Sequence, residues 1–142
     1  MTADLYWLTL TALMTAVLTI PYVSERILRV GIGSALGYSK DSGTGGFDQA
    51  TEKPAKWAKR CWAAHRNAVE GFPIFAALVL TAHIAGITGG GMVVVAAQTY
   101  FFARLAHYLF YLAGVPVLRT LSFFVALIAM FAISYFILTG AA

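Results

Sequence analysis

Four long apolar stretches follow one another along the chain, separated by glycine- or proline-containing breaks and by one long polar connection. They cover approximately residues 5–23, 63–87, 92–113 and 119–138. A helix needs about 20 mostly apolar residues to cross the ~30 Å hydrocarbon core of a bilayer, and each stretch is close to that length. The pattern therefore predicts an all-α membrane protein, a bundle of four transmembrane helices formed by a single domain over residues 1–142.

Composition supports the same class. The chain is 60% hydrophobic and 11% charged, whereas soluble domains carry about 25% charged residues. From Gly71 to the end of the sequence, only Arg104 and Arg119 carry a formal charge. Such a chain has too much apolar surface to hide in a soluble fold. With one cysteine, Cys61, it has no internal disulfide.

The basic residues predict the orientation in the membrane. Eight of the ten lysines and arginines lie in or beside the connection between the first two stretches: Arg26, Arg29, Lys40, Lys53, Lys56, Lys59, Arg60 and Arg66. The positive-inside rule therefore predicts that this connection is cytoplasmic and that both termini face the opposite side. Charge in this position indicates topology rather than nucleic-acid binding, so no nucleic-acid partner is expected.

The first connection is expected to be a long loop. The first helix is predicted to end near Pro21 and the charged pair Glu25-Arg26, and the loop to continue to about Lys59 through the glycine-rich segment 43–46. The later connections are short, so the helices that they join are predicted to be antiparallel neighbours.

Polar residues interrupt the apolar pattern at the start of the second helix. Arg66 and Glu70 are four residues apart and share a helical face, with Asn67 beside it. Charge in an apolar helix is costly and often marks a function. The structural alternative is an ion pair at the membrane interface, with the arginine side chain extending toward water.

The third helix carries a second polar stripe. Arg104, His107 and Tyr111 follow at i, i+3 and i+7, and Arg119 opens the fourth helix on the same side. Arg104 is too deep to reach water easily and needs a partner, for which Glu70 is the obvious candidate. Alternatively, His107 is a hydrogen-bonded interior histidine and Arg119 only follows the positive-inside rule.

The combined side chains suit a small zwitterion with extra carboxylates. Arginine binds carboxylates through forked hydrogen bonds, and a glutamate binds an ammonium group. An apolar second ligand could enter from the lipid. The sequence has no metal-type Cys/His spacing and no phosphate-binding Gly-rich loop, so no metal is expected. His83 is predicted near the outer end of its helix and is interpreted as structural or interfacial.

Two motifs resemble those of the MAPEG superfamily, membrane-associated proteins in eicosanoid and glutathione metabolism. Ala64-His65-Arg66-Asn67 with Glu70 resembles the second-helix signature of that family. Arg104-Leu105-Ala106-His107 with Tyr111 resembles the third-helix motif, most closely in the microsomal prostaglandin E synthase branch. The short, alanine-rich chain is similar to bacterial members.

The resemblance implies a homotrimer that binds glutathione as co-substrate between subunits, while a lipophilic electrophile or hydroperoxide arrives from the membrane. Arg119 would stabilise the glutathione thiolate. The residues implied to line the glutathione site are Arg66, Asn67, Glu70, Arg104, His107, Tyr111 and one of Arg26 and Arg29.

Three positions depart from the prostaglandin branch. Ala63 stands in place of an arginine, Phe123 in place of a tyrosine, and the hydroxyl of Thr120 would replace that of a serine. These changes affect the residues around the thiolate, so two functions stay open. One is a glutathione transferase or peroxidase in the bacterial inner membrane. The other is a non-catalytic lipid- or ligand-binding or structural protein of the same fold. A small multidrug transporter is disfavoured, because the first stretch contains no charged residue.

Overall fold

The structure is a computed structural model that describes residues 1–35, 54–87 and 91–140. The described chain forms helices α1 (Ala3–Val17), α2 (Ile20–Ala35), α3 (Lys56–Ile84), α4 (Met92–Ala113) and α5 (Pro116–Thr139). The glycine-rich segment 43–46, predicted to lie in the first connection, is outside the described residues.

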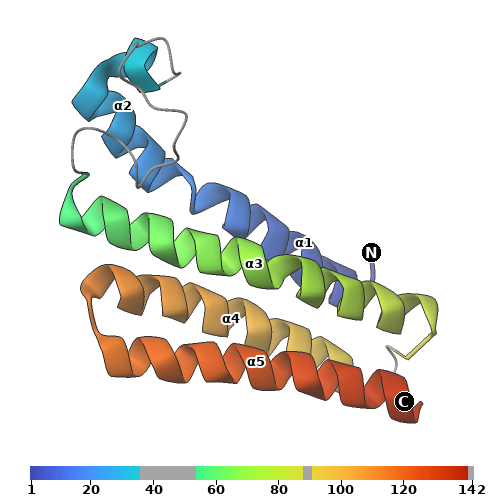
Figure 1. The fold of residues 1–142 in the computed structure, drawn as a ribbon. Coiled ribbons are helices and arrows are strands. Elements are labelled where there is room, and N and C mark those ends of the chain that lie inside the picture. Colours follow the sequence, from blue (N-terminus) through green and yellow to red (C-terminus); the bar gives the residue numbers. More distant parts are fainter. Residues whose placement is uncertain (36–53, 88–90, 141–142) are drawn as a thin grey trace.

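The helices form an elongated bundle (Figure 1). α3, α4 and α5 run side by side with alternating direction, and α1 packs against α3 and α4. One end of the bundle, here called the turn end, holds the start of α3 and the turn between α4 and α5. The other end, here called the terminal end, holds the N-terminus, the end of α3 and the end of α5. α2 contacts α3 and leads away from the turn end.

The first helix does not stop at Pro21 as predicted. α1 ends at Val17, and α2 begins at Ile20 and continues past Glu25 and Arg26. Proline at the second position of α2 is tolerated because the first turn of a helix has no internal acceptor for its backbone N–H groups. Pro21 therefore starts a new helix instead of ending the old one, and the charged pair lies on that helix.

Within the described residues, three helical stretches are long and apolar enough to cross a membrane: Ala3–Arg29, Lys56–Ile84 and Pro116–Thr139. α4 is the fourth long helix, and it carries Arg104 and His107 within its length. Large apolar side chains point outward along the bundle, including Leu13, Ile74, Leu121, Ile128 and Phe131. An apolar exterior of this kind suits a lipid environment.

The core lies between α3, α4 and α5 toward the terminal end. The rings of Phe75 and Tyr100 stack with centroids 3.9 Å apart, and Ile133 is completely buried beside them. Alanines such as Ala97 and Ala126 let the helix backbones approach closely there. This packing joins the three helices and sets the position of the polar residues at the turn end.

The α4–α5 turn determines where Arg119 lies. Gly114 adopts a left-handed conformation, with φ of 76°, and ends α4. A Cβ atom there would lie 2.8 Å from the Arg60 guanidinium, so glycine also gives Arg60 room to approach. α5 then begins at Pro116, a residue suited to the first turn, before the predicted start at residue 119. Arg119 consequently lies in the first turn of α5, facing the start of α3.

Candidate functional site

A cavity of about 370 Å³ opens at the turn end, between α3, α4 and α5. Its lining consists of Trp62, Ala63, Arg66, Asn67, Glu70, His107, Tyr111 and Arg119. Six of these eight side chains are candidate site residues from the sequence. The helix packing therefore brings polar residues from three separate segments around one space.

Arg66 and Glu70 form the outer wall of the cavity. Arg66 Nε donates to Glu70 Oε1 at 3.0 Å, and the two side chains are 63% and 58% exposed. The Arg66 guanidinium also lies 5.7 Å from the centre of the Trp62 ring. An exposed i,i+4 pair stabilises a helix by only about 0.3–0.5 kcal/mol. A ligand that offers a carboxylate to Arg66 and an ammonium group to Glu70 can therefore replace this pair at small cost.

The predicted pairing of Arg104 with Glu70 is wrong. Arg104 is 4% exposed, and its Nη1 donates to Asn67 Oδ1 at 2.6 Å. Helix geometry explains the difference. Asn67 lies on the face of α3 that meets α4, whereas Glu70 lies on the face it shares with Arg66, turned toward the outside.

His107 connects α4 to the first turn of α5. Its Nδ1 lies 2.9 Å from the Arg119 carbonyl oxygen, and because a carbonyl can only accept, Nδ1 carries the proton. Ser122 donates to the same oxygen at 2.9 Å. His107 Nε2 is buried and has no hydrogen-bond partner among the residues that the structure describes. The histidine is thus held in one orientation at the cavity wall.

The Arg119 side chain lies against Tyr111. Its guanidinium carbon is 4.6 Å from the centre of the Tyr111 ring, a cation–π contact that holds the charge at the cavity wall. Thr120, the next residue, donates its hydroxyl to the Pro116 carbonyl at 2.9 Å and is exposed outside the cavity lining. The structure therefore brings Arg119 into the cavity but gives the Thr120 hydroxyl a backbone partner.

Arg26 and Arg29 lie on α2, away from the cavity lining of their own chain. Arg29 Nε is 3.1 Å from Glu25 Oε1, and the same carboxylate oxygen accepts the backbone N–H of Ala55 at 3.0 Å. These contacts connect α2 to the residue that precedes α3. In the described single chain, Arg29 belongs to this junction.

The sequence motif also contains a residue with a structural role. His65 lies between the Thr19 and Tyr22 hydroxyls, at 3.2 Å and 3.0 Å from its two ring nitrogens. It therefore fixes the junction of α1 and α2 against α3. Its proximity to Arg66 in the sequence gives no sign of this, because neighbouring residues on a helix point in directions about 100° apart.

Two residues that line the cavity are not among the site residues predicted from the sequence. Trp62 precedes Arg66 by four positions, so helical spacing could have indicated it. Ala63 is the position at which the prostaglandin branch carries an arginine, and it lines the cavity here. Alanine at this position leaves the cavity with one cation fewer than the pattern of that branch implies.

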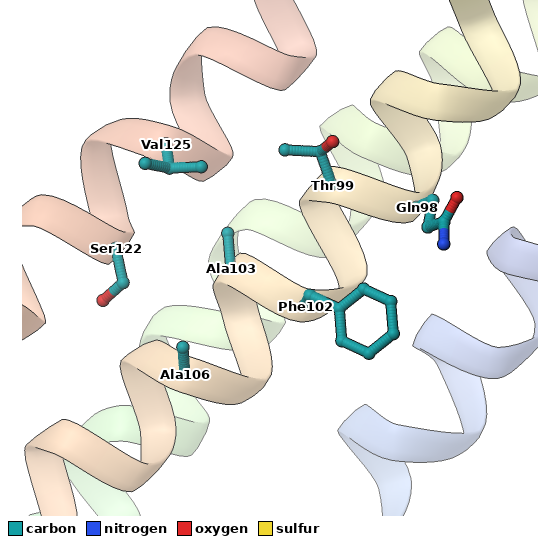
Figure 2. Close-up of a pocket in the computed structure, with 7 residues that line it drawn as sticks. All are labelled: Gln98, Thr99, Phe102, Ala103, Ala106, Ser122 and Val125. Carbon is teal, nitrogen blue, oxygen red and sulfur yellow. The ribbon is translucent and has the colours of Figure 1, made fainter.

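A second cavity, of about 400 Å³, lies along α4 and α5 (Figure 2). It is lined by Gln98, Thr99, Phe102, Ala103, Ala106, Ser122 and Val125. Figure 2 shows the small side chains of Ala103 and Ala106 on α4 opposite Ser122 and Val125 on α5. This second cavity is here called the apolar groove. Ser122 belongs to it and also bonds the Arg119 backbone, so the groove and the polar cavity meet at one turn of α5.

The fold and the polar cavity define a helical membrane protein with a cationic site at one end of the bundle. In the part of the chain that the structure describes, no group of three or more His, Cys, Asp or Glu residues is arranged to hold a metal ion. The model of the MAPEG family matches residues 4–139, and the chain belongs to that family. A comparison with curated proteins finds no match. The chain is accordingly an integral membrane protein of a family with glutathione-related functions.

Proposed function

We propose that the cavity at the turn end binds glutathione and that the protein is a glutathione-dependent transferase or peroxidase for lipophilic electrophiles or hydroperoxides. One observation carries the proposal. A single cavity of about 370 Å³ combines two arginines, a carboxylate, an amide, an imidazole and a phenol from three helices. Family membership supports the same ligand.

The charges of the cavity complement those of glutathione, which has two carboxylates, one ammonium group and a thiol. Arg66 suits a carboxylate, since its fork of N–H donors matches the two oxygens. Glu70, next to it, suits the ammonium group.

Arg119 is the proposed stabiliser of the thiolate. A cysteine thiol with a pKa of ~8.5 is mostly protonated at neutral pH, and a nearby cation lowers that pKa. The thiolate sulfur then bonds to an electrophilic carbon, and the leaving group departs with its electron pair. With a hydroperoxide, the sulfur bonds to the terminal oxygen as the O–O bond breaks, which forms a sulfenic acid, and the departing alkoxide takes a proton from water to become an alcohol. A second glutathione converts the resulting sulfenic acid to a disulfide and water.

The lipophilic substrate is proposed to approach along the apolar groove. The groove is open on the outer face of α4 and α5, where the chain would meet lipid. Ser122, which lines the groove, bonds the backbone of Arg119, and the groove therefore lies close to the proposed thiolate. An apolar molecule in the groove would therefore be near the reacting sulfur without crossing water.

The proposed assembly is a homotrimer in a bacterial inner membrane, with the turn end cytoplasmic. The concentration of lysine and arginine around the first connection supports this orientation. In the described chain, neither Arg26 nor Arg29 lines the cavity of its own subunit. In a trimer, one of these arginines would instead reach the cavity of a neighbouring subunit. The trimer would therefore allow Arg26 or Arg29 to line a glutathione site, as the family resemblance implies.

Binding and turnover in detergent micelles test the proposal. Isothermal titration with glutathione should give saturable binding that is weakened in Arg66→Gln and retained in Lys56→Gln. The latter removes one exposed charge at the same end of the bundle, outside the cavity lining. Conjugation of a chlorinated aromatic electrophile should accompany binding. A wild-type protein that does not bind glutathione contradicts the proposal.

A non-catalytic ligand-binding protein is the second candidate. The observation that favours it is the lack of a free hydroxyl beside Arg119 in the described part of α5: Thr120 bonds the Pro116 carbonyl, and Phe123 has none. Under this alternative, glutathione binds saturably and no electrophile or hydroperoxide is turned over.

A further inference from the structure

Arg104 lies behind the cavity wall instead of in it. The family resemblance implies that Arg104 lines the glutathione site, yet the side chain is 4% exposed and lies outside the cavity lining of the described chain. Between Arg104 and the cavity lies Asn67, which contacts both. A buried cation in a membrane helix is costly, so its position calls for a role other than direct contact with solvent or ligand.

The surroundings of Arg104 hold its guanidinium in one place. Its central carbon lies 5.2 Å from the Tyr100 ring centre and 5.7 Å from that of Phe123. Gly71 completes this cradle on the α3 side, because a Cβ atom there would overlap Arg104 Nη2. Gly71 is one helical turn beyond Asn67 on the same face. Glycine at this position therefore gives the guanidinium the space that it needs to reach Asn67.

The hydrogen bond from Arg104 determines the orientation of the Asn67 amide. A guanidinium can only donate, so the Asn67 atom 2.6 Å away must be the oxygen, Oδ1. The amide nitrogen, which can only donate, is then turned from Arg104 and remains for the cavity that Asn67 lines. Without Arg104 the amide is free to rotate and to present its oxygen, an acceptor, to the same space.

We propose that Arg104 and Gly71 are positioning residues that make Asn67 a fixed N–H donor toward a carboxylate or carbonyl oxygen of the ligand. Arg104 acts through Asn67 and does not touch the ligand. This inference rests on the proposed function for the identity of the ligand, glutathione, but the orientation of Asn67 is a property of the protein alone. The two are therefore tested separately.

A double-mutant cycle tests whether Arg104 acts through Asn67. The variants are Arg104→Met, Asn67→Ala and the combination, with glutathione affinity measured by isothermal titration. Loss of a hydrogen bond to a charged group predicts about tenfold weaker binding for Asn67→Ala and a similar loss for Arg104→Met. The double variant should bind no more weakly than Asn67→Ala alone. Losses that multiply would overturn the proposal, because they indicate an independent contact between Arg104 and glutathione.

Gly71→Ala provides a second route that keeps Arg104 in the chain. The added methyl group should push the guanidinium out of its cradle and weaken glutathione binding to the level of Arg104→Met. Ala77→Ser is the matched control, because it adds one heavy atom at an exposed position of the same helix. Full affinity in Gly71→Ala, or equal losses in both variants, contradicts the role of Gly71.

The ligand-free protein separates this inference from the proposed function. The experiment compares ligand-free crystal structures of the wild type and of a variant, either Arg104→Met or Gly71→Ala, whichever folds. In the variant, the Asn67 amide should be turned from its wild-type position. An unchanged Asn67 overturns the positioning role. If the amide turns but the wild-type protein does not bind glutathione, the positioning role stands and the proposed function fails.

Discussion

Each end of the bundle holds a pair of one acidic and one basic side chain, and the two pairs differ in how deeply they are buried. At the terminal end, Asp4 in the first turn of α1 is completely buried, and its Oδ2 lies 3.0 Å from Nδ1 of His83 in the last turn of α3. At the turn end, Arg66 and Glu70 pair while more than half exposed, beside a cavity. Both pairs join an acidic and a basic side chain, but only the second lines the cavity at the turn end.

The comparison teaches that a charge in a membrane helix is not by itself a sign of a ligand site. Asp4 at a helix N-terminus and His83 at a helix C-terminus each complement the helix dipole, so their contact fastens α1 to α3. Arg66, Arg119 and Glu70 keep part of their hydrogen-bonding capacity for other partners. Accessibility of the charged atoms, and not their presence, distinguishes the two ends.

The largest expected effect is on catalysis, at the turn end. Arg119→Ala removes the proposed cation beside the thiolate and should lower kcat for conjugation by about 10²–10³-fold, since loss of one group that stabilises developing charge has that magnitude. The thiolate absorbance of bound glutathione should disappear as well. Arg119→Lys should retain part of both, and Lys56→Ala should leave them unchanged. Undiminished conjugation in Arg119→Ala would remove this residue from the mechanism.

The next effect is on stability, at the terminal end. His83→Ala leaves the buried Asp4 carboxylate without its partner and should destabilise the protein by about 2 kcal/mol, the penalty for an unsatisfied buried polar group. Thermal unfolding in detergent, followed by circular dichroism, measures this change. Glutathione affinity should stay at the wild-type value. A loss of affinity with unchanged stability would mean that the two ends are not separate in function.

A smaller effect concerns recognition of the ammonium group. Glu70→Gln removes the proposed carboxylate partner and should weaken glutathione binding by about tenfold, the scale of one charged hydrogen bond. The control is the glutathione analogue that lacks the amino group, for which wild type and Glu70→Gln should bind equally well. If both ligands lose the same affinity, Glu70 acts on the fold of α3 and not on the ammonium group.

The smallest effect is expected at Thr120. Its hydroxyl bonds the Pro116 carbonyl within the same helix, so Thr120→Val should change kcat by less than about twofold and stability by less than about 0.5 kcal/mol. The conjugation assay and thermal unfolding measure the two quantities. A large fall in kcat would show that the hydroxyl turns into the cavity during the reaction.

Much of the candidate site could be predicted from spacing alone. Arg66 and Glu70 share a face because they are four residues apart on a helix, and the structure forms their hydrogen bond at 3.0 Å. His107, Tyr111 and Arg119 lie around the same cavity because two antiparallel helices joined by a short turn place their ends together. These relations depend on local geometry, which the order of residues determines.

Other features could not be predicted, because they depend on which face of one helix meets another. Glu70 was the expected partner of Arg104, and Asn67 is the observed one. Asn67 and Glu70 are three residues apart and are neighbours on the surface of α3. Only the rotation of α3 about its axis relative to α4 decides which of them meets Arg104. Pro21 shows a related limit, since the same residue can end a helix or begin one.

The sequence by itself determined the membrane class, the helical architecture and the grouping of polar residues toward one end, since these follow from hydrophobic length, helical period and the placement of charge. Only the tertiary structure decided which polar atoms face a cavity and which face each other. The reason is that side-chain pairing between helices depends on axial rotation and on space: the missing side chain of Gly71 admits the Arg104 guanidinium to Asn67. The periodic pattern of apolar and polar residues does not reveal such a space between two helices.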